Sequence, residues 1–166
     1  MNKKGFTLIE LLIVIAIMAI IASVIFVALN PLQRFQDSRD SVRWQQASQI
    51  LNAIKLQQVD NGGYLLSDIA VLSTSTNYMI TASAVGSGCD DQNSYCTTDV
   101  DADGACVDLS QLVTDGYLSA IPFSPTGEYD WASSDLTGYT LEKTESGAVF
   151  IRACENENSS EIVLSR

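Results

Sequence analysis

The sequence is dominated by an apolar run near its start, where residues 3–29 read KKGFTLIELLIVIAIMAIIASVIFVAL. Between Phe6 and Leu29 the only charged side chain is that of Glu10. At a helical rise of about 1.5 Å per residue this run spans roughly 36 Å, more than the ~30 Å hydrocarbon thickness of a bilayer. The run therefore predicts a helix that can span a membrane, to which the rest of the chain is attached.

The order of residues around the run differs from that of a secretory signal peptide, whose small-residue cleavage site follows the apolar region. Here the small residue, Gly5, precedes the apolar region, and a carboxylate follows at Glu10. A carboxylate inside a membrane span is costly and is normally kept for a function. Glu10 is therefore expected to need a cationic partner. The alternative is an ordinary membrane anchor whose Glu10 is hydrated at the interface.

The segment Gly5-Phe6-Thr7-Leu8-Ile9-Glu10, preceded by Lys3 and Lys4, resembles the start of the type IV pilins, a family that includes the type II secretion pseudopilins. The resemblance implies a prepilin peptidase that cuts between Gly5 and Phe6 and methylates the new amino terminus, giving N-methylphenylalanine. It also implies that Glu10 pairs with the Phe6 amine of a neighbouring subunit during filament assembly. The expected leader peptide is residues 1–5, and the expected transmembrane and filament-core helix is residues 6–29.

The helix is expected to continue over residues 30–61 after an interruption. Asn30-Pro31 predicts a kink, because proline lacks an N–H and disfavours helical geometry in the residue before it. Beyond it, one apolar face is predicted from spacings of i, i+3, i+4 and i+7, at Ala47, Ile50, Leu51 and Ile54. Four polar positions are interpreted as solvated or inter-subunit: Arg39, Arg43, Gln46 and Gln57. Gly62 or Gly63 is expected to end the helix in the left-handed conformation.

Residues 62–166 are expected to form a globular head with a connecting loop and an antiparallel sheet. Residues 65–100 show little periodicity and predict a loop with one short strand at 78–82. Residues 139–143 and 148–154 predict a hairpin, and 162–164 a last strand. The predicted fold is α+β: a long N-terminal hydrophobic helix, or stalk, packed against a small C-terminal antiparallel β-sheet domain, a pilin-like roll.

Four cysteines, Cys89, Cys96, Cys106 and Cys154, lie in the part expected to be exported. An even number of cysteines in an exported domain predicts two disulfides, with three possible pairings. Cys89–Cys96 with Cys106–Cys154 is the favoured pairing, since the first bond closes a short loop. A zinc site is disfavoured, because the chain has no histidine and no Cys-x-x-Cys pair.

A possible calcium site is indicated by Asp99, Asp101 and Asp103, followed by Gly104. Alternating carboxylates before a glycine match the first half of an EF-hand loop, in which oxygen ligands wrap Ca²⁺. The second half does not match, because Ser110 occupies the position of the bidentate glutamate. A calcium site and a plain acidic turn are both left open.

Charge and composition argue against nucleic-acid binding and against catalysis. From residue 45 onward 17 acidic residues face four basic ones, a net charge of −13, which argues against nucleic acid as a partner. The chain has no histidine, and no glycine-rich phosphate loop or paired nucleophile and base is evident. The sequence therefore predicts no catalytic residues, no enzyme activity and no required cofactor.

The leading interpretation is the major pilin of a type IV pilus-like extracellular filament that serves adhesion, motility or surface attachment. Its expected partners are further copies in a helical homo-oligomer, a prepilin peptidase, the inner-membrane assembly machinery and, before assembly, the membrane itself. The precursor is expected to cross the inner (cytoplasmic) membrane once and to leave it for the extracellular pilus. Two alternatives remain: a pseudopilin of a type II secretion system, and a membrane-tethered calcium-binding adhesin.

Overall fold

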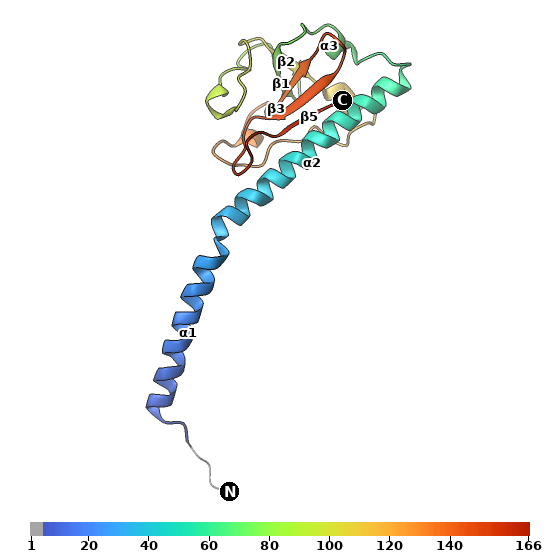
Figure 1. Ribbon diagram of the computed structural model, residues 1–166. Helices are drawn as coiled ribbons and strands as arrows, with labels where there is room; N and C mark the ends of the chain where they lie inside the picture. The colour runs from blue at the N-terminus through green and yellow to red at the C-terminus, as the bar shows by residue number, and fades with distance from the viewer. Residues whose placement is uncertain (1–4) are drawn as a thin grey trace. The chain divides into compact units, whose positions relative to one another are not determined.

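The computed structural model describes residues 5–166 (Figure 1). Residues 1–4, which include Lys3 and Lys4 and most of the predicted leader peptide, lie outside the described residues. The chain divides into two compact units, one ending at Phe35 and one running from Gln36 to Arg166. The second unit therefore contains the amphipathic part of the long helix together with the sheet.

The first helix, α1, runs from Leu8 to Leu29 and contains almost only aliphatic residues. Asn30 follows it with a left-handed backbone (φ 37°), a conformation that asparagine adopts more readily than most residues. The next helix, α2, runs from Pro31 to Asp60. Proline suits the first helical position, where its missing N–H breaks no intrahelical bond. The two helices are thus separated at Asn30-Pro31.

Helix α2 covers the core with the apolar face predicted from its spacing. Ala47, Ile50 and Ile54 are fully buried, and Leu51 is nearly so. The helix ends before Gly62 and Gly63, whose φ values of 67° and 96° confirm the left-handed glycines expected there. Amphipathic spacing therefore located the buried face of this helix, and the glycine pair located its end.

The interpretation of two polar residues of α2 as solvated or inter-subunit positions is wrong. Arg43 has no exposed surface, and Gln57 is 5% exposed. The reason lies far along the chain, where the segment after the fourth strand supplies carboxylates that cover Arg43. Arg39 and Gln46 are only partly exposed, and Gln46 accepts a hydrogen bond from the Tyr139 hydroxyl. Helical periodicity does not reveal such remote polar partners.

The sheet has five strands in the order β2-β1-β3-β4-β5. Their bounds are Asn77–Thr81 for β1, Cys106–Asp108 for β2, Leu136–Lys143 for β3, Val149–Ala153 for β4 and Val163–Ser165 for β5. The predicted hairpin is confirmed as β3 and β4, paired antiparallel from Tyr139–Ala153 to Lys143–Val149. The edge strand β2 pairs parallel with β1, so the sheet is not wholly antiparallel. Two short helices flank β1 and β2 in the chain, α3 (Ser67–Ala70) and α4 (Ser110–Thr114).

The main core lies between α2 and one face of the sheet, and it confirms the predicted α+β roll. Ile50 and Ile54 of α2 join Ile80, Leu141 and Ile151 of the three central strands in one buried cluster. A second cluster surrounds Trp131, in the short 3₁₀ helix Trp131–Ser133. Gly138 (φ 75°) permits this packing, because a Cβ there would lie 2.6 Å from the indole Cδ2 of Trp131.

Candidate functional site

The predicted processing residues lie at the exposed start of the described chain. Gly5 and Phe6 precede the first turn of α1, and the Phe6 side chain is 80% exposed. A Cβ at Gly5 would meet no heavy atom within 4 Å. The structure therefore gives Gly5 no packing role, and a requirement for a small residue here would come from a partner such as a peptidase.

Thr7 and Glu10 form a capping box at the start of α1, which the sequence reasoning missed although Thr-x-x-Glu before an apolar run is its usual signature. The Glu10 N–H donates to Thr7 Oγ1 (3.3 Å). In return, the Thr7 N–H (3.0 Å) and hydroxyl (2.8 Å) both donate to Glu10 Oε2. Among residues 5–166, Glu10 Oε1 has no hydrogen-bond partner, so this oxygen is open to one. Pairing of Glu10 with a neighbour's Phe6 amine stays a prediction, because the structure holds one chain.

The surface of α1 is apolar and uncovered. From Leu8 to Phe26 its large hydrophobic side chains are 43–82% exposed. By length and composition, one helical stretch in residues 5–166 is apolar enough to cross a membrane, and it begins at Leu8. An apolar surface of this extent requires lipid or other protein around it. The segment thus fits both a membrane and the inside of an assembly.

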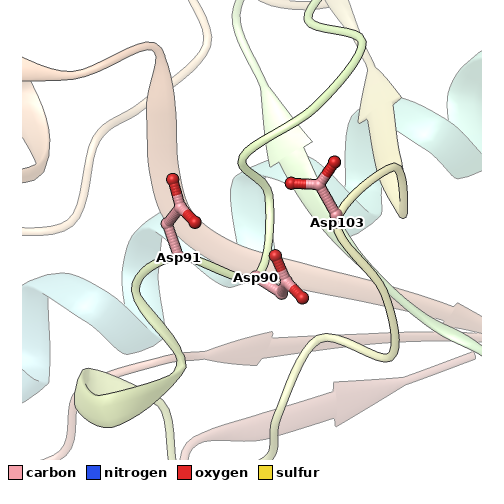
Figure 2. A group of neighbouring side chains, drawn as sticks. All are labelled: Asp90, Asp91 and Asp103. Atoms are coloured by element: carbon pink, nitrogen blue, oxygen red, sulfur yellow. The ribbon is translucent and has the colours of Figure 1, made fainter.

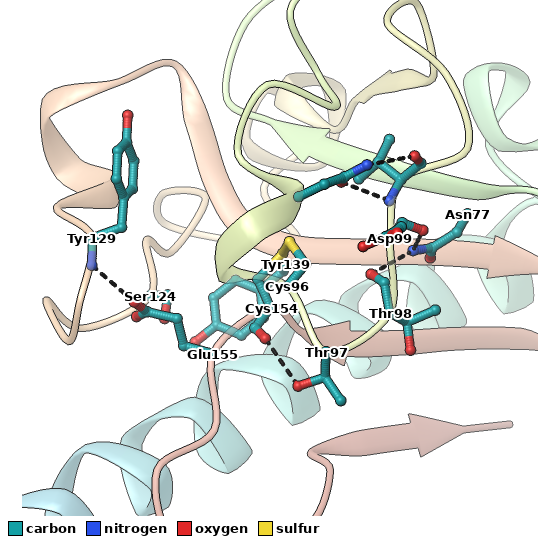
Figure 3. The surroundings of a disulfide bond; sticks show 12 residues. Asn77, Cys96, Thr97, Thr98, Asp99, Ser124, Tyr129, Tyr139, Cys154 and Glu155 are labelled. Carbon is teal, nitrogen blue, oxygen red and sulfur yellow. Dashed lines mark hydrogen bonds between the residues drawn. A yellow bond between two sulfur atoms is a disulfide. The ribbon is translucent and has the colours of Figure 1, made fainter.

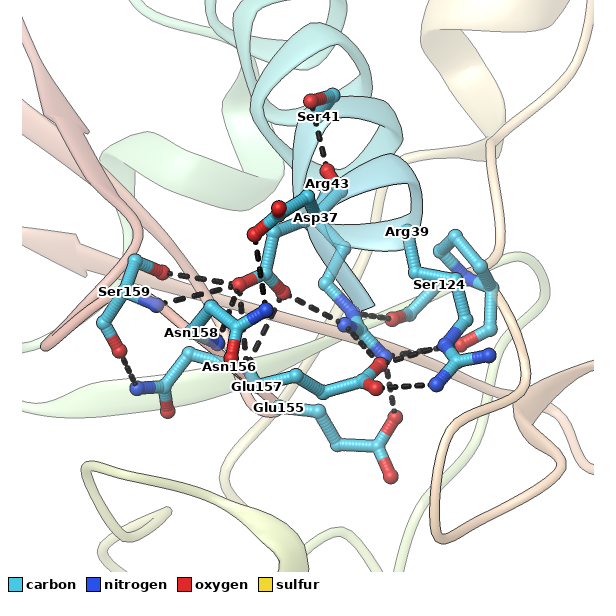
Figure 4. Close-up of polar contacts among 12 residues, drawn as sticks. Asp37, Arg39, Ser41, Arg43, Ser124, Glu155, Asn156, Glu157, Asn158 and Ser159 are labelled. Atoms are coloured by element: carbon cyan, nitrogen blue, oxygen red, sulfur yellow. Dashed lines mark hydrogen bonds and ion pairs between the residues drawn. The ribbon is translucent and has the colours of Figure 1, made fainter. Parts of the chain in front are cut away.

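A buried ionic cluster, here called the Arg43 cluster (Arg39, Asp40, Arg43, Glu155 and Glu157), joins α2 to the segment after β4 (Figure 4). Arg43 Nη1 lies 2.8 Å from both Asp40 Oδ1 and Glu157 Oε1, and Nη2 lies 2.9 Å from Glu155 Oε2. The remaining donors reach Ser124 Oγ and the Pro125 carbonyl oxygen, each at 3.1 Å. All five guanidinium N–H groups are therefore satisfied, as burial of an arginine requires.

The same cluster fixes the segment after β4 to the start of the second unit. Asp40 accepts hydrogen bonds from the N–H groups of Glu157 (3.1 Å), Asn158 (2.9 Å) and Ser159 (3.3 Å). The Arg39 guanidinium makes a two-pronged contact with the Glu157 carboxylate. Sequence reasoning had no signal for this arrangement, since Asp40 and Glu157 are 117 residues apart.

The cluster favours the charged form of two of its carboxylates, those of Asp40 and Glu157. Burial opposes ionisation of Asp40, but N–H groups of Asn158 and Glu157 and the Arg43 guanidinium outweigh it and lower the Asp40 pKa. The hydrogen bond from Arg39 lowers the pKa of Glu157 against the opposing effect of burial, and Arg43 lowers it further. Burial alone would lower the pKa of Arg43, but Glu157 and Asp40 raise it. The cluster is consequently ionic at neutral pH and sensitive to acid.

The four cysteines form two disulfides, and the favoured pairing is wrong. Cys89 is bonded to Cys106. Cys96 is bonded to Cys154, and Figure 3 shows this second disulfide. Backbone hydrogen bonds explain why the cysteines pair in this way. The Cys89 N–H donates to the Asp103 carbonyl (3.0 Å), which brings Cys89 beside the Cys106 loop, and the Thr97 N–H donates to the Cys154 carbonyl (2.9 Å). The 3₁₀ helix Asn93–Tyr95 lies between Cys89 and Cys96.

The carboxylates predicted to hold calcium do not form one group in the described part of the chain. Asp101 Oδ2 instead accepts from the Asn77 N–H (2.5 Å), and Asp103 Oδ1 accepts from the Gly88 N–H (2.7 Å). Asp103 groups with two residues of the preceding loop, and one carboxylate oxygen from each of Asp90, Asp91 and Asp103 lies within 4.8 Å of the others (Figure 2). The sequence pattern identified one member of this group and missed two.

Comparison with known proteins adds to these observations. Residues 1–26 match a family model described as the prokaryotic N-terminal methylation motif. The chain is similar to the type IV wide pilus major component PilA4 of Thermus thermophilus, at 39% identity over 98 residues, 57% of this chain and 71% of the relative. No solved structure matches the chain. The stretch that aligns with the relative is longer than the N-terminal motif.

Proposed function

This chain belongs to the type IV pilin family, and from that premise we propose that it is the major subunit of a long extracellular filament. The family is structural, so the chain is a building block and not an enzyme. The proposed filament serves adhesion, motility or surface attachment, with α1 in its interior and the acidic second unit outside.

The observation that supports this proposal best is the uncovered apolar surface of α1 with a single carboxylate at Glu10. Side by side, such helices would bury their apolar surfaces against one another. Inside that bundle a carboxylate needs a cation, and the Phe6 amine of a neighbouring subunit would supply one once the chain is cut after Gly5. Repetition of this pair along the filament would set the axial register of each subunit.

Before assembly the same helix would anchor the precursor in the inner membrane. We propose that a prepilin peptidase removes residues 1–5 and methylates Phe6, and that inner-membrane assembly machinery draws the processed subunit into the filament. The membrane and the filament interior would be alternative surroundings for one apolar surface, which explains why α1 needs no partner from its own chain.

Replacing Glu10 tests the proposal in cells that make the full chain. Glu10→Ala removes the charge, and Glu10→Gln removes the charge but keeps an acceptor for the Thr7 donors. Both variants should keep a normal membrane pool by fractionation and lose sheared fibres by electron microscopy. Fibres from the Gln variant would assign Glu10 to helix capping alone, and fibres from both would remove support for the pair.

The wild-type fibres also distinguish the proposed function from its alternatives. Sheared material should contain long fibres whose dominant band starts with N-methylated Phe6. Short fibres confined to the periplasm would indicate a secretion pseudopilin instead. A processed or unprocessed chain that never leaves the membrane would indicate a tethered adhesin.

We also propose that a calcium ion binds the second unit at Asp90, Asp91 and Asp103. The support is the approach of three carboxylates to within 4.8 Å, which a hard divalent cation would stabilise by cancelling their mutual repulsion. These residues replace the ligand set Asp99, Asp101 and Asp103 expected from the sequence. The filament itself requires no cofactor in this proposal.

A further inference from the structure

We propose that a pocket beside the Cys96–Cys154 disulfide receives Arg34 of a second copy of this chain and so makes a lateral contact in the filament. The pocket, called here the Tyr95 pocket, has a volume of about 480 Å³, and its lining includes Gln36, Arg39, Tyr95, Glu128, Glu155 and Glu157. All of its lining residues belong to the second unit. The inference rests on the proposed filament and adds a specific partner to it.

The charge of the pocket favours a cation. Three carboxylates and one guanidinium line it, a net charge of −2. Two of these carboxylates already have ion-pair partners within the chain: Glu155 pairs with Arg43, and Glu157 pairs with both Arg39 and Arg43. Among the residues that the structure describes, the Glu128 carboxylate has no partner, and the residue is exposed. The pocket therefore offers one free carboxylate to an incoming base.

The rim around Glu128 is held in place and includes an aromatic side chain. The N–H groups of Glu128 and Tyr129 both donate to Glu155 Oε1 at 2.9 Å, which ties this loop to the Arg43 cluster. The Tyr95 ring lines the pocket and packs on Tyr129, with 5.0 Å between ring centroids. A planar guanidinium can stack on such a ring while it donates to a carboxylate, which an ammonium does less well.

Among the described residues, Arg34 is the basic residue whose side chain lacks an acceptor. Residues 5–166 contain seven basic side chains, and Arg34 alone among them has no hydrogen bond or ion pair. Each of the other six contacts an acceptor: Arg39 contacts Glu157, Arg43 contacts Asp40, Lys55 contacts Gln58, Lys143 contacts the Ala70 carbonyl, Arg152 contacts Glu142, and Arg166 contacts Asn52. Arg34 is also exposed. An unpaired guanidinium and an unpaired carboxylate in a negative pocket are complementary, and such pairs fix register and partner choice between subunits.

Charge reversal tests the contact in cells that express the full chain. The variants are Glu128→Arg, Arg34→Glu and the two combined, and the readouts are sheared fibre and membrane pool. Each single variant should reduce fibre yield on the order of tenfold while the pool stays normal. The combined variant should restore fibre to near the wild-type amount, because it recreates the pair with its charges exchanged.

A second acidic residue provides the matched control. Glu145 lies in the β3–β4 turn, is exposed and makes no ion pair among the described residues, so Glu145→Arg changes the net charge equally at another place. It should leave fibre yield unchanged and should not rescue Arg34→Glu. Normal fibre from Glu128→Arg, failure of the combined variant, or equal rescue by Glu145→Arg would each overturn the contact while wild-type fibres still upheld the pilus. Absence of wild-type fibres would overturn both proposals.

Discussion

Replacing Arg43 by methionine should destabilise the second unit far more than the same replacement at Arg39. Arg43 is completely buried and contacts three carboxylates. Methionine retains much of the aliphatic stem but leaves Asp40, Glu155 and Glu157 close together without their shared cation. Breaking a buried ion pair from one side costs about 3–5 kcal/mol, because the remaining charges stay desolvated. We expect Arg43→Met to lose that much free energy of unfolding.

Arg39 provides the comparison because it belongs to the same cluster but lies nearer to solvent. Its side chain is 32% exposed, and its one carboxylate partner, Glu157, keeps Arg43 as a second cation. After Arg39→Met the Glu157 carboxylate still has Arg43 as its cation, so the expected loss of unfolding free energy is about 0–1 kcal/mol. The difference between the two variants isolates the effect of burial from that of losing one positive charge.

The pH dependence of stability gives a second signature. Asp40 and Glu157 have lowered pKa values in the folded chain, so the unfolded chain takes up their protons at a higher pH than the folded chain does. Their stabilising contribution is complete above the unfolded pKa of about 4, and it is lost as pH falls through the folded values. Arg43→Met removes the main buried cation, so it should flatten the fall in stability below pH ~4.

The measurement is urea unfolding of the full-length chain in detergent micelles at several pH values. Urea is preferable to guanidinium chloride, whose ions would screen the cluster. Trp131 is fully buried, so near-UV circular dichroism should report loss of packing around it. Equal destabilisation by Arg39→Met and Arg43→Met, or an unchanged pH dependence in the Arg43 variant, would refute the conclusion that the buried Arg43 guanidinium stabilises the contact between α2 and the segment after β4.

Three further outcomes follow from individual features of the second unit. Gly127→Ala should lower the free energy of unfolding by about 1–3 kcal/mol, because the added Cβ would lie 2.8 Å from both Arg43 Nη2 and Glu155 Oε2. Gly86→Ala, whose Cβ would meet no heavy atom within 4 Å, is the control in the same urea assay. Non-reducing peptide mapping should recover Cys89–Cys106 and Cys96–Cys154, and loss of the second bond should cost about 1 kcal/mol more, because it spans 58 residues and the first spans 17. Calcium at a hundredfold excess over its Kd should stabilise the second unit by about 2.7 kcal/mol. An equal effect in a variant with asparagine in place of Asp90, Asp91 and Asp103 would contradict the site.

Local patterns in the sequence predicted those parts of the fold that local physics determines. Spacing alone located the face of α2 that contains Ile50 and Ile54, because a helix that covers a sheet repeats its buried residues every three to four positions. Two segments rich in β-branched and aromatic residues, separated by a glycine-containing turn, predicted the β3–β4 hairpin. The apolar run predicted α1, and the Gly5-Phe6 pair with Glu10 pointed to the pilin family before any comparison.

Features that depend on contacts distant in sequence were predicted poorly. Arg43 was assigned to the surface because nothing near it in the sequence announces Glu155 and Glu157, more than a hundred residues away. The disulfide pairing failed for the same reason, since it follows from the loop that carries Cys89 lying beside Asp103. The parallel strand β2 has only three residues and follows an acidic turn, too short for a periodic signal. The Thr7 cap is different, because its signature was present and was overlooked.

Two adjacent residues directly after β4 are held by different kinds of bond. Cys154 is covalently bonded to Cys96, and Glu155 is bound ionically to Arg43. A reductant would cleave the disulfide and leave the ion pairs intact. Acid that protonates Asp40 and Glu157, whose pKa values the cluster lowers, would weaken the ionic contacts of the same segment and leave the disulfide intact. Each treatment alone should therefore leave one attachment of the C-terminal segment in place. We expect this segment to be released only when acid and a reductant act together, so each kind of bond protects the segment against the treatment that breaks the other.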